Sequence, residues 1–228
     1  TPLGGTPLGG TPLGGLDIAK KISAPLQFRA MPSFFEPAAI AIGSSTGGPQ
    51  ALFTLLADWP AKLQQPIFIT QHMPPTFTTI LGEHITRISK RPAAEAKDGE
   101  FVKPGRIYIA PGDYHLSIEE IGKDKILRVR QTPPENFCRP SVDPMFTSLS
   151  RVYQKNVLAI MLTGMGRDGL AGTQAIIDNG GLAIAQDETS SVVWGMPGTI
   201  ANAGLCSAVV SLPEMAGFVS KLLLRGAT

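Results

Sequence analysis

The sequence predicts an α/β fold in three αβα layers, with a doubly wound, mainly parallel sheet and a small antiparallel hairpin. Short apolar runs alternate with segments of helical spacing from residue 38 onward, as in repeated βα units. Turns rich in Gly and Pro separate these segments. A chain of 228 residues can bury one sizeable core, so we expect one folded domain.

The first 37 residues differ in composition from the rest of the chain. Residues 1–15 are three copies of Thr-Pro-Leu-Gly-Gly, which resists regular structure. The Pro- and Phe-rich stretch that ends at Pro37 is expected to lie on the domain as a tether. We therefore predict a flexible linker or tether over residues 1–37 and the folded domain over residues 38–228.

The expected strands are short apolar runs that end at turns. They cover residues 38–42, 66–71, 106–110, 157–162, 182–185 and 208–211. Two further runs, 116–119 and 126–130, are joined by the turn Gly122-Lys-Asp and are expected to pair as the hairpin. The other strands are separated by helical segments, which favours parallel pairing.

The expected helices follow the strands and would cover both faces of the sheet. They span residues 49–57, 76–90, 141–153 and 170–178, and a last helix begins at Pro213. Pro49 suits the first turn of its helix, because the N–H that proline lacks has no partner at that position.

Composition excludes several classes of function. The net charge is +2 with both signs spread along the chain, so no basic stripe indicates nucleic-acid binding. No apolar run reaches the roughly 18 residues that a membrane-spanning helix needs, so we expect no membrane insertion. Cys138 and Cys206 make no disulfide framework and have no metal-like spacing with the histidines. We expect a cytoplasmic protein without a structural metal.

Ser45 lies where an expected strand turns into a helix. The segment Gly43-Ser-Ser-Thr-Gly47 fits the pattern G-x-S-x-G, which places a serine hydroxyl at the carboxyl end of a strand. The amides at the start of the following helix can hold an oxyanion. Phosphate-binding loops also use a strand, a turn and a helix, but the glycine spacing here differs from theirs and no Gly-Lys-Ser/Thr is present.

A histidine and a carboxylate follow two other expected strands. His72 comes directly after the run 66–71, and Asp168 follows the run 157–162. Because ligands bind outside the carboxyl ends of parallel strands, Ser45, His72 and Asp168 should share one edge of the sheet. This set of residue types predicts a Ser-His-Asp triad. Its chain order differs from the Ser…Asp…His order of α/β-hydrolases.

The other two histidines have weaker claims on the site. His84 lies in a segment of helical spacing, where a solvated or half-buried position is expected. His115 follows a turn that enters a strand, and its sequence position is compatible with either a site residue or a structural one.

Six segments in order resemble the catalytic domain of chemotaxis protein-glutamate methylesterases. They are Ala41-Ile-Gly-Ser-Ser-Thr-Gly-Gly48, Ile69-Thr-Gln-His-Met-Pro-Pro75, Gly105-Arg-Ile-Tyr-Ile-Ala-Pro-Gly-Asp113, Arg139-Pro-Ser-Val-Asp143, Leu162-Thr-Gly-Met-Gly-Arg-Asp-Gly169 and Gly195-Met-Pro197. Any one of them could arise by chance, but the six together are specific. The resemblance covers about residues 38 to 215.

The resemblance implies a hydrolase that removes methyl groups from glutamate γ-methyl esters of methyl-accepting chemotaxis receptors. Some members of the family also deamidate receptor glutamines. The implied partners are the cytoplasmic helices of these receptors and a receiver domain, present in a fuller chain or acting in trans. No metal or organic cofactor is implied.

The resemblance also assigns roles to individual residues. Ser45 would be the nucleophile, with Ser44 as the alternative, and His72 the general base that Asp168 orients. Oxyanion donors would come from the amides of Thr46, Gly47 and Gly48 at the helix start or from the 163–166 loop, where the resemblance favours Met165. Met196 is expected either to wall the substrate cleft or to pack on the core.

Three rival functions remain open from the residues alone. The Gly43–Gly48 loop could cradle a nucleotide phosphate in a protein without catalytic activity. The domain could dock on receptors as an inactive scaffold. It could also be a serine hydrolase of another substrate class, such as a small-molecule esterase.

Overall fold

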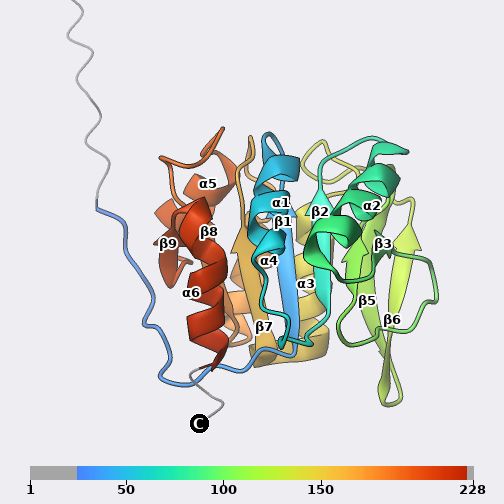
Figure 1. Ribbon diagram of the computed structural model, residues 1–228, viewed down its shortest axis with the longest axis horizontal. Coiled ribbons are helices and arrows are strands. Elements are labelled where there is room, and N and C mark those ends of the chain that lie inside the picture. The colour runs from blue at the N-terminus through green and yellow to red at the C-terminus, as the bar shows by residue number, and fades with distance from the viewer. Residues whose placement is uncertain (1–24, 225–228) are drawn as a thin grey trace, which may run out of the picture.

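A computed structural model describes residues 25–224, so the repeat at 1–15 and the rest of the predicted linker up to residue 24 lie outside the described residues. The described chain forms a seven-stranded sheet between two layers of helices, with a separate two-stranded sheet at one side (Figure 1). The strand order is β3-β4-β2-β1-β7-β8-β9, and every pairing in this sheet is parallel.

The seven strands of the sheet are short and mostly buried. They are β1 (Ala39–Ser44), β2 (Ile67–Gln71), β3 (Ala93–Glu95), β4 (Ile107–Ile109), β7 (Val157–Met161), β8 (Leu182–Gln186) and β9 (Ala208–Val210). The hairpin consists of β5 (His115–Ile121) and β6 (Asp124–Arg130), which pair antiparallel. The structure confirms the predicted three-layer fold with its parallel sheet and hairpin.

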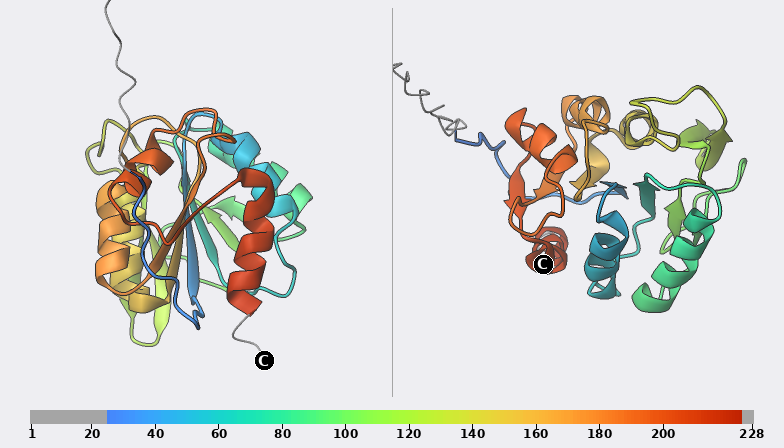
Figure 2. Two further views of the ribbon diagram at one scale, coloured as in Figure 1. Left: turned by 90° about the vertical axis from the view of Figure 1, so that its left-hand side faces the viewer. Right: turned by 90° about the horizontal axis from the view of Figure 1, so that it is seen from above.

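Helices cover both faces of the sheet, as Figure 2 shows from the side and from above. The helices are α1 (Gly48–Ala57), α2 (Phe77–Ser89), α3 (Val142–Tyr153), α4 (Leu170–Asp178), α5 (Met196–Asn202) and α6 (Leu212–Leu224), with a 3₁₀ turn at Gln154–Asn156. Side chains of β1 alternate between the two layers: Ile40 and Ile42 pack towards α1, α2 and α6, whereas Ala39 and Ala41 face α3, α4 and α5.

The register of three central strands determines where the site can form. β1 lies between β2 and β7, with Ser44 opposite Gln71 and Gly43 opposite both Thr70 and Met161. Because neighbouring parallel strands are about 4.8 Å apart, the residues that follow these pairs emerge side by side at one edge. This edge is where the strand order changes direction, the usual place for a ligand in an open α/β sheet.

Two elements were missed by the sequence analysis. β3 has only three residues, too few for a recognisable pattern. α5 begins at Met196, in a segment that was expected to be a loop, and its seven residues include Pro197 and Gly198. Pro is tolerated in the first turn of a helix, so the chain can start α5 there despite a composition typical of turns.

The N-terminal segment from residue 25 to residue 38 has no helix or strand, but it lies against the domain. Phe35 is buried with the α1–α2–α6 core, and the Arg29 amide donates to the Cys206 carbonyl at 2.9 Å. Among residues 25–224, no helix combines the length and apolar character that a membrane crossing requires.

Helices α3 and α4 pack closely because α4 presents a glycine to α3. A Cβ atom on Gly172 would lie 2.5 Å from Phe146 Cβ and 3.1 Å from the Asp143 carbonyl oxygen. Neither atom can move without shifting α3. The position of α3 relative to α4 therefore depends on the absence of a side chain at residue 172.

We predict that Gly172→Ala lowers the free energy of unfolding by about 1–3 kcal/mol, because the added methyl group overpacks this contact. Gly217→Ala in α6 is the matched control, since nothing lies within 4 Å of its Cβ position. That control should leave stability unchanged or raise it by up to about 1 kcal/mol through helix propensity. Urea unfolding measures both variants, and equal effects would show that the α3–α4 contact tolerates a side chain.

Candidate active site

Ser45 follows β1 by one residue and precedes α1 by three. The chain turns between them at Gly47, whose φ of 79° is left-handed and suits glycine. Ser45 is partly exposed, and its Oγ has no hydrogen-bond partner among residues 25–224. Its hydroxyl is therefore accessible at the carboxyl edge of the sheet.

The side chain of Gln71 ties the Ser45 segment to the His72 segment. Its Nε2 donates to the Ser45 carbonyl at 2.9 Å and to the His72 carbonyl at 3.0 Å. Its Oε1 accepts from the Ser44 hydroxyl at 2.7 Å. A Cβ atom on Gly48 would lie only 1.9 Å from that Oε1, so glycine is needed there for Gln71 to take this position.

This arrangement distinguishes the two adjacent serines. Ser44 is fully buried and its hydroxyl is bonded to Gln71, whereas Ser45 is partly exposed. The geometry therefore favours Ser45 over Ser44 as the nucleophile candidate.

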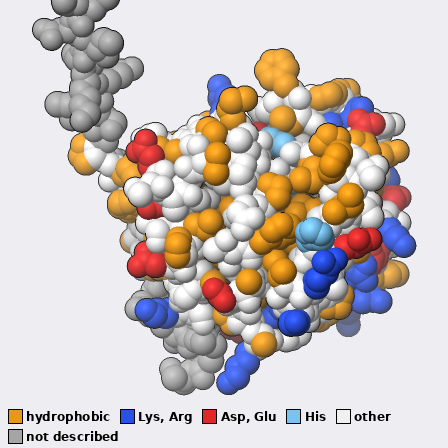
Figure 3. Space-filling model, turned by 45° about the horizontal axis from the view of Figure 1, so that its top comes forward, with side chains coloured by type: hydrophobic (Ala, Val, Ile, Leu, Met, Phe, Trp, Pro, Cys, Tyr) orange, Lys and Arg blue, Asp and Glu red, His pale blue; other side chains and the backbone are white. Residues whose placement is uncertain are grey.

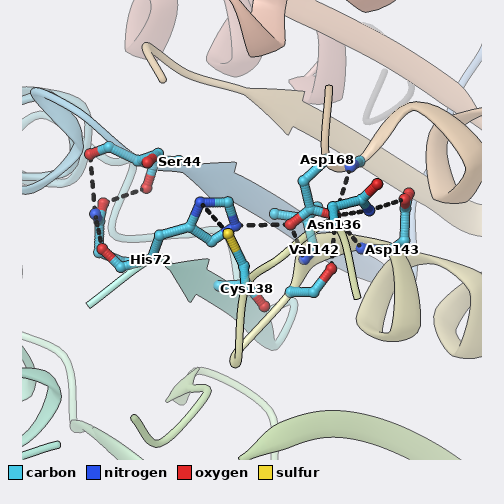
Figure 4. Close-up of polar contacts among 12 residues, drawn as sticks. Ser44, His72, Asn136, Cys138, Val142, Asp143 and Asp168 are labelled. Carbon is cyan, nitrogen blue, oxygen red and sulfur yellow. Dashed lines mark hydrogen bonds and ion pairs between the residues drawn. The ribbon is translucent and has the colours of Figure 1, made fainter. Parts of the chain in front are cut away.

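His72 and Asp168 are in direct contact, as predicted. His72 Nε2 lies 2.7 Å from Asp168 Oδ2, and the two side chains are 13% and 2% exposed (Figure 4). An ionised carboxylate only accepts, so Nε2 carries the proton in this pair and Nδ1 is the nitrogen with a free lone pair. Nδ1 lies 3.5 Å from Cys138 Sγ. The base nitrogen available to a substrate is therefore Nδ1.

Six donors among residues 25–224 hold Asp168. They are His72 Nε2, Asn136 Nδ2, Ser141 Oγ and the backbone amides of Val142, Asp143 and Gly169. The shortest are Ser141 Oγ and Val142 N, each 2.6 Å from a carboxylate oxygen. The amides of Val142 and Asp143 start helix α3, so the carboxylate occupies the positive end of the helix dipole.

These contacts decide the ionisation of the carboxylate. Burial alone would raise the pKa of Asp168, but the hydrogen bonds from His72, Ser141 and Val142 outweigh it and hold that pKa below its ordinary value. Asp168 is therefore an anion at neutral pH, which is the state that orients a histidine base.

Three backbone amides near Ser45 are available for an oxyanion. Within residues 25–224 the amides of Thr46, Gly47 and Met165 have no hydrogen-bond partner. The Gly48 amide already donates to the Ser45 carbonyl at 2.8 Å, and the Gly164 amide to the Val193 carbonyl at 3.0 Å. Of the predicted donors at the start of α1, Gly48 is therefore engaged, whereas Thr46 and Gly47 are free within the described residues, and their role as oxyanion donors stays a prediction.

Met196 was expected either to wall the cleft or to pack in the core, and the first of these two positions is wrong. Its side chain is 0% exposed and packs in the core, so it does not wall a cleft. A Cβ atom on Gly164 would lie 2.5 Å from Met196 Sδ and 2.8 Å from Ser45 Cβ. Met196 thus packs against Gly164, on the loop that contacts Ser45. Its burial follows from the unexpected helix α5, which turns the side chain inward.

The other two described histidines, His84 and His115, do not bond Asp168. His84 is exposed on α2 with its ring centroid 5.7 Å from that of Phe53. His115 is buried and structural: Nδ1 accepts from the Ser141 amide at 3.2 Å, and Nε2 lies 3.1 Å from the Pro133 carbonyl. Its role is to hold the segment that leads into α3.

Sequence reasoning missed two side chains that act on the site. Gln71 was noted only as the end of a strand, and Asn136 lies in a loop without periodicity. The pattern that could have pointed to Gln71 is its position next to His72 at a buried strand end, where a polar side chain needs partners. No pattern in the sequence points to Asn136.

Several hydrophobic side chains are exposed around the site. Four exposed hydrophobic side chains belong to loops or helix ends at this edge: Phe77, Phe137, Met165 and Val192. In Figure 3 hydrophobic side chains are scattered over this face, while most charged groups lie towards its periphery. Within the described part of the chain, no group of three or more His, Cys, Asp or Glu side chains could hold a metal ion.

Comparisons with known proteins show which family the sequence resembles. The model of a family described as CheB methylesterase matches residues 40–219. A protein-glutamate methylesterase/protein-glutamine glutaminase of Paramagnetospirillum magneticum is 60% identical over 202 residues, which are 88% of this chain and 53% of that protein. One from Rhodospirillum rubrum is 55% identical over 208 residues, 89% of this chain and 52% of that protein. The chain thus spans about half the length of these relatives.

The fold has a match among solved structures as well. The crystal structure of the Thermotoga maritima CheB methylesterase catalytic domain superposes with a TM-score of 0.79 at 35% identity. The match covers 82% of this chain and 99% of that domain.

We predict that Asp168→Asn destabilises the protein by about 2 kcal/mol at pH 7, because it removes the anion that binds the start of α3. The folded-state pKa of Asp168 is lowered, so its stabilisation is complete above the ordinary Asp pKa of about 4 and is lost as pH falls through the folded value. The stability difference between wild type and variant should therefore shrink as pH falls below about 4. Urea unfolding over a pH series measures it.

The control for this pH series is Asp178→Asn, at the exposed end of α4. It should change stability by less than about 0.5 kcal/mol throughout. A pH-independent loss in Asp168→Asn would show that the carboxylate acts through shape rather than through its charge.

Proposed function

Because this chain belongs to the CheB methylesterase family, we propose that it hydrolyses glutamate γ-methyl esters on methyl-accepting chemotaxis receptors. The observation that carries the proposal is the ionised Asp168, bonded to His72, at the sheet edge where Ser45 presents its hydroxyl. The assignment of Ser45, His72 and Asp168 as the catalytic triad is part of this proposal.

The proposed reaction has two steps. Ser45 Oγ attacks the ester carbonyl while His72 Nδ1 takes its proton and then gives it to the leaving methanol. Water, activated by the same nitrogen, then hydrolyses the acyl-enzyme. Cys138 Sγ lies 3.5 Å from Nδ1. The thiol must therefore move away so that the serine hydroxyl can hydrogen-bond Nδ1 during the reaction.

Developing charge on the carbonyl oxygen requires donors that are free in the resting site. The unpartnered amides of Thr46, Gly47 and Met165 supply them, and one such donor is worth about 3 kcal/mol of transition-state stabilisation. The same attack on a γ-amide would release ammonia, so glutaminase activity follows from the same residues. The relatives' names include both activities.

The partners and setting follow from the same proposal. A methyl ester at the end of a glutamate side chain can reach a partly exposed serine while its carrier helix stays folded, and the apolar rim suits such a helix. The family resemblance adds a receiver domain, in a fuller chain or in trans, as a second proposed partner. We assign the catalytic domain to residues 38–228 after a linker over 1–37, acting in the cytoplasm without a cofactor.

Ser45→Ala should abolish methanol release from methylated receptors in membranes, because the nucleophile is gone while the fold is intact. Ser44→Ala is the matched control, one residue away, and should keep measurable activity, since its hydroxyl only bonds Gln71. Methanol release, followed by gas chromatography, separates the two. Activity in Ser45→Ala together with none in Ser44→Ala would move the nucleophile to Ser44.

His72→Gln should lower kcat by at least about a thousandfold with little change in KM, because the variant has no base at this position. Steady-state kinetics of methanol release measures both constants. His84→Gln, on the exposed face of α2, is the control and should behave as wild type. A loss of less than tenfold in His72→Gln would remove His72 from the mechanism.

A further inference from the structure

We propose that Asn136 is a positioning residue for this reaction: its side-chain amide fixes the Asp168 carboxylate and so sets the orientation of His72. The inference rests on the proposed esterase function. Its structural part, the effect of Asn136 on the His72–Asp168 hydrogen bond, can be tested separately from turnover.

The contacts place Asn136 on the far side of the carboxylate from the histidine. Asn136 Nδ2 lies 2.9 Å from Asp168 Oδ1, while His72 Nε2 lies 2.7 Å from Oδ2 (Figure 4). A carboxylate held at both oxygens cannot rotate freely about its bond to Cβ. Asn136 therefore helps to keep Oδ2 directed at the imidazole.

The same amide nitrogen also separates two acidic side chains. Asn136 Nδ2 lies 2.8 Å from Asp143 Oδ2, so its two hydrogens serve Asp143 and Asp168. Burial raises the pKa of Asp143, and the neighbouring Asp168 adds to that rise. Asn136 Nδ2 thus donates to both carboxylates at once, in addition to the backbone donors that each of them has.

The backbone around Asn136 is built to aim this side chain. Glu135 and Cys138 exchange two backbone hydrogen bonds, of 3.1 Å and 2.9 Å, which close a two-residue turn. Both central residues are left-handed, with φ of 51° at Asn136 and 64° at Phe137. Asn adopts this conformation more readily than most residues, so its presence at 136 satisfies the turn and the carboxylate together.

Both arms of the turn are tied to the residues at the start of β5 and just before it. His115 Nε2 lies 3.1 Å from the Pro133 carbonyl on one arm. On the other, Arg139 donates to Asp113 Oδ1 at 2.8 and 2.6 Å. The amide is therefore held in place before any substrate arrives, which is the condition for a positioning role.

A purely structural role would follow if Asn136 served only to adopt the left-handed turn. Asn136→Gly separates the two roles, because glycine keeps the positive φ and removes the side chain that carries the amide donor. Asn136→Asp is isosteric but replaces the donor with a third acidic group beside Asp143 and Asp168. Gln131→Ala is the matched control, since Gln131 Nε2 bonds Asp113 Oδ2 at 2.6 Å and makes no contact with the catalytic pair.

The experiment measures kcat and KM for methanol release in the wild type and the three variants, with stability checked by urea unfolding. We expect Asn136→Gly to lower kcat about 10- to 100-fold, the size expected for a lost hydrogen bond to a charged group, with KM within about twofold. Asn136→Asp should lose more, and Gln131→Ala should match wild type. Proton NMR should show the His72 Nε2–H resonance in wild type and Gln131→Ala, and show it shifted or broadened in Asn136→Gly.

Several results would overturn the proposal. One is a folded Asn136→Gly protein with wild-type kcat and an unchanged Nε2–H resonance. Another is loss of the folded state in both Asn136 variants, which would make the residue structural. A wild type that releases no methanol would contradict the proposed function instead, and the NMR comparison would still decide the role of Asn136.

Discussion

The structure depends on one buried anion at the start of one helix. Asp168 accepts the first amides of α3, and this places the negative charge where the helix dipole favours it. The carboxylate is 2% exposed, so the cost of burying it is offset only because six donors surround it. Helix α4 begins two residues later, close against α3 through Gly172. One side chain thus joins two helices of a layer to the His72 imidazole.

The sheet supplies the second constraint, and this part could be predicted from the sequence. Ser45 and His72 each directly follow a buried apolar run, and Asp168 lies in the loop after a third. Parallel strands bring their carboxyl ends to one edge, so local patterns were enough to gather three distant residues. The contact between His72 and Asp168 confirms that step. The burial of Ser44 favours Ser45 as the nucleophile candidate of the two adjacent serines.

Other features could not be predicted because long-range contacts determine them. Asn136 lies on a turn whose arms are held by residues 113 and 115, and nothing near it in the chain predicts that turn. The sequence could not decide whether Met196 walls the cleft or packs in the core, because a segment that contains Gly and Pro does not predict a seven-residue helix. The choice of Nε2 rather than Nδ1 as the nitrogen that meets Asp168 depends on the direction from which the carboxylate approaches. The spacing of apolar residues predicts which face of a helix or strand is buried and where the element ends, but not from which direction one side chain approaches another.

The attachment of Asp168 to α3 has a consequence for how this domain can change under selection. Catalytic residues are often held at the expense of stability, so that replacing them makes a protein inactive but more robust. Here the carboxylate that bonds the His72 imidazole also anchors α3, so under the proposed function activity and stability decline together when its charge is lost. Under the proposed function, activity is therefore lost most easily without loss of the fold at Ser45, whose side chain bonds no other side chain among residues 25–224. Degenerate copies of this domain should more often lack the serine than the aspartate.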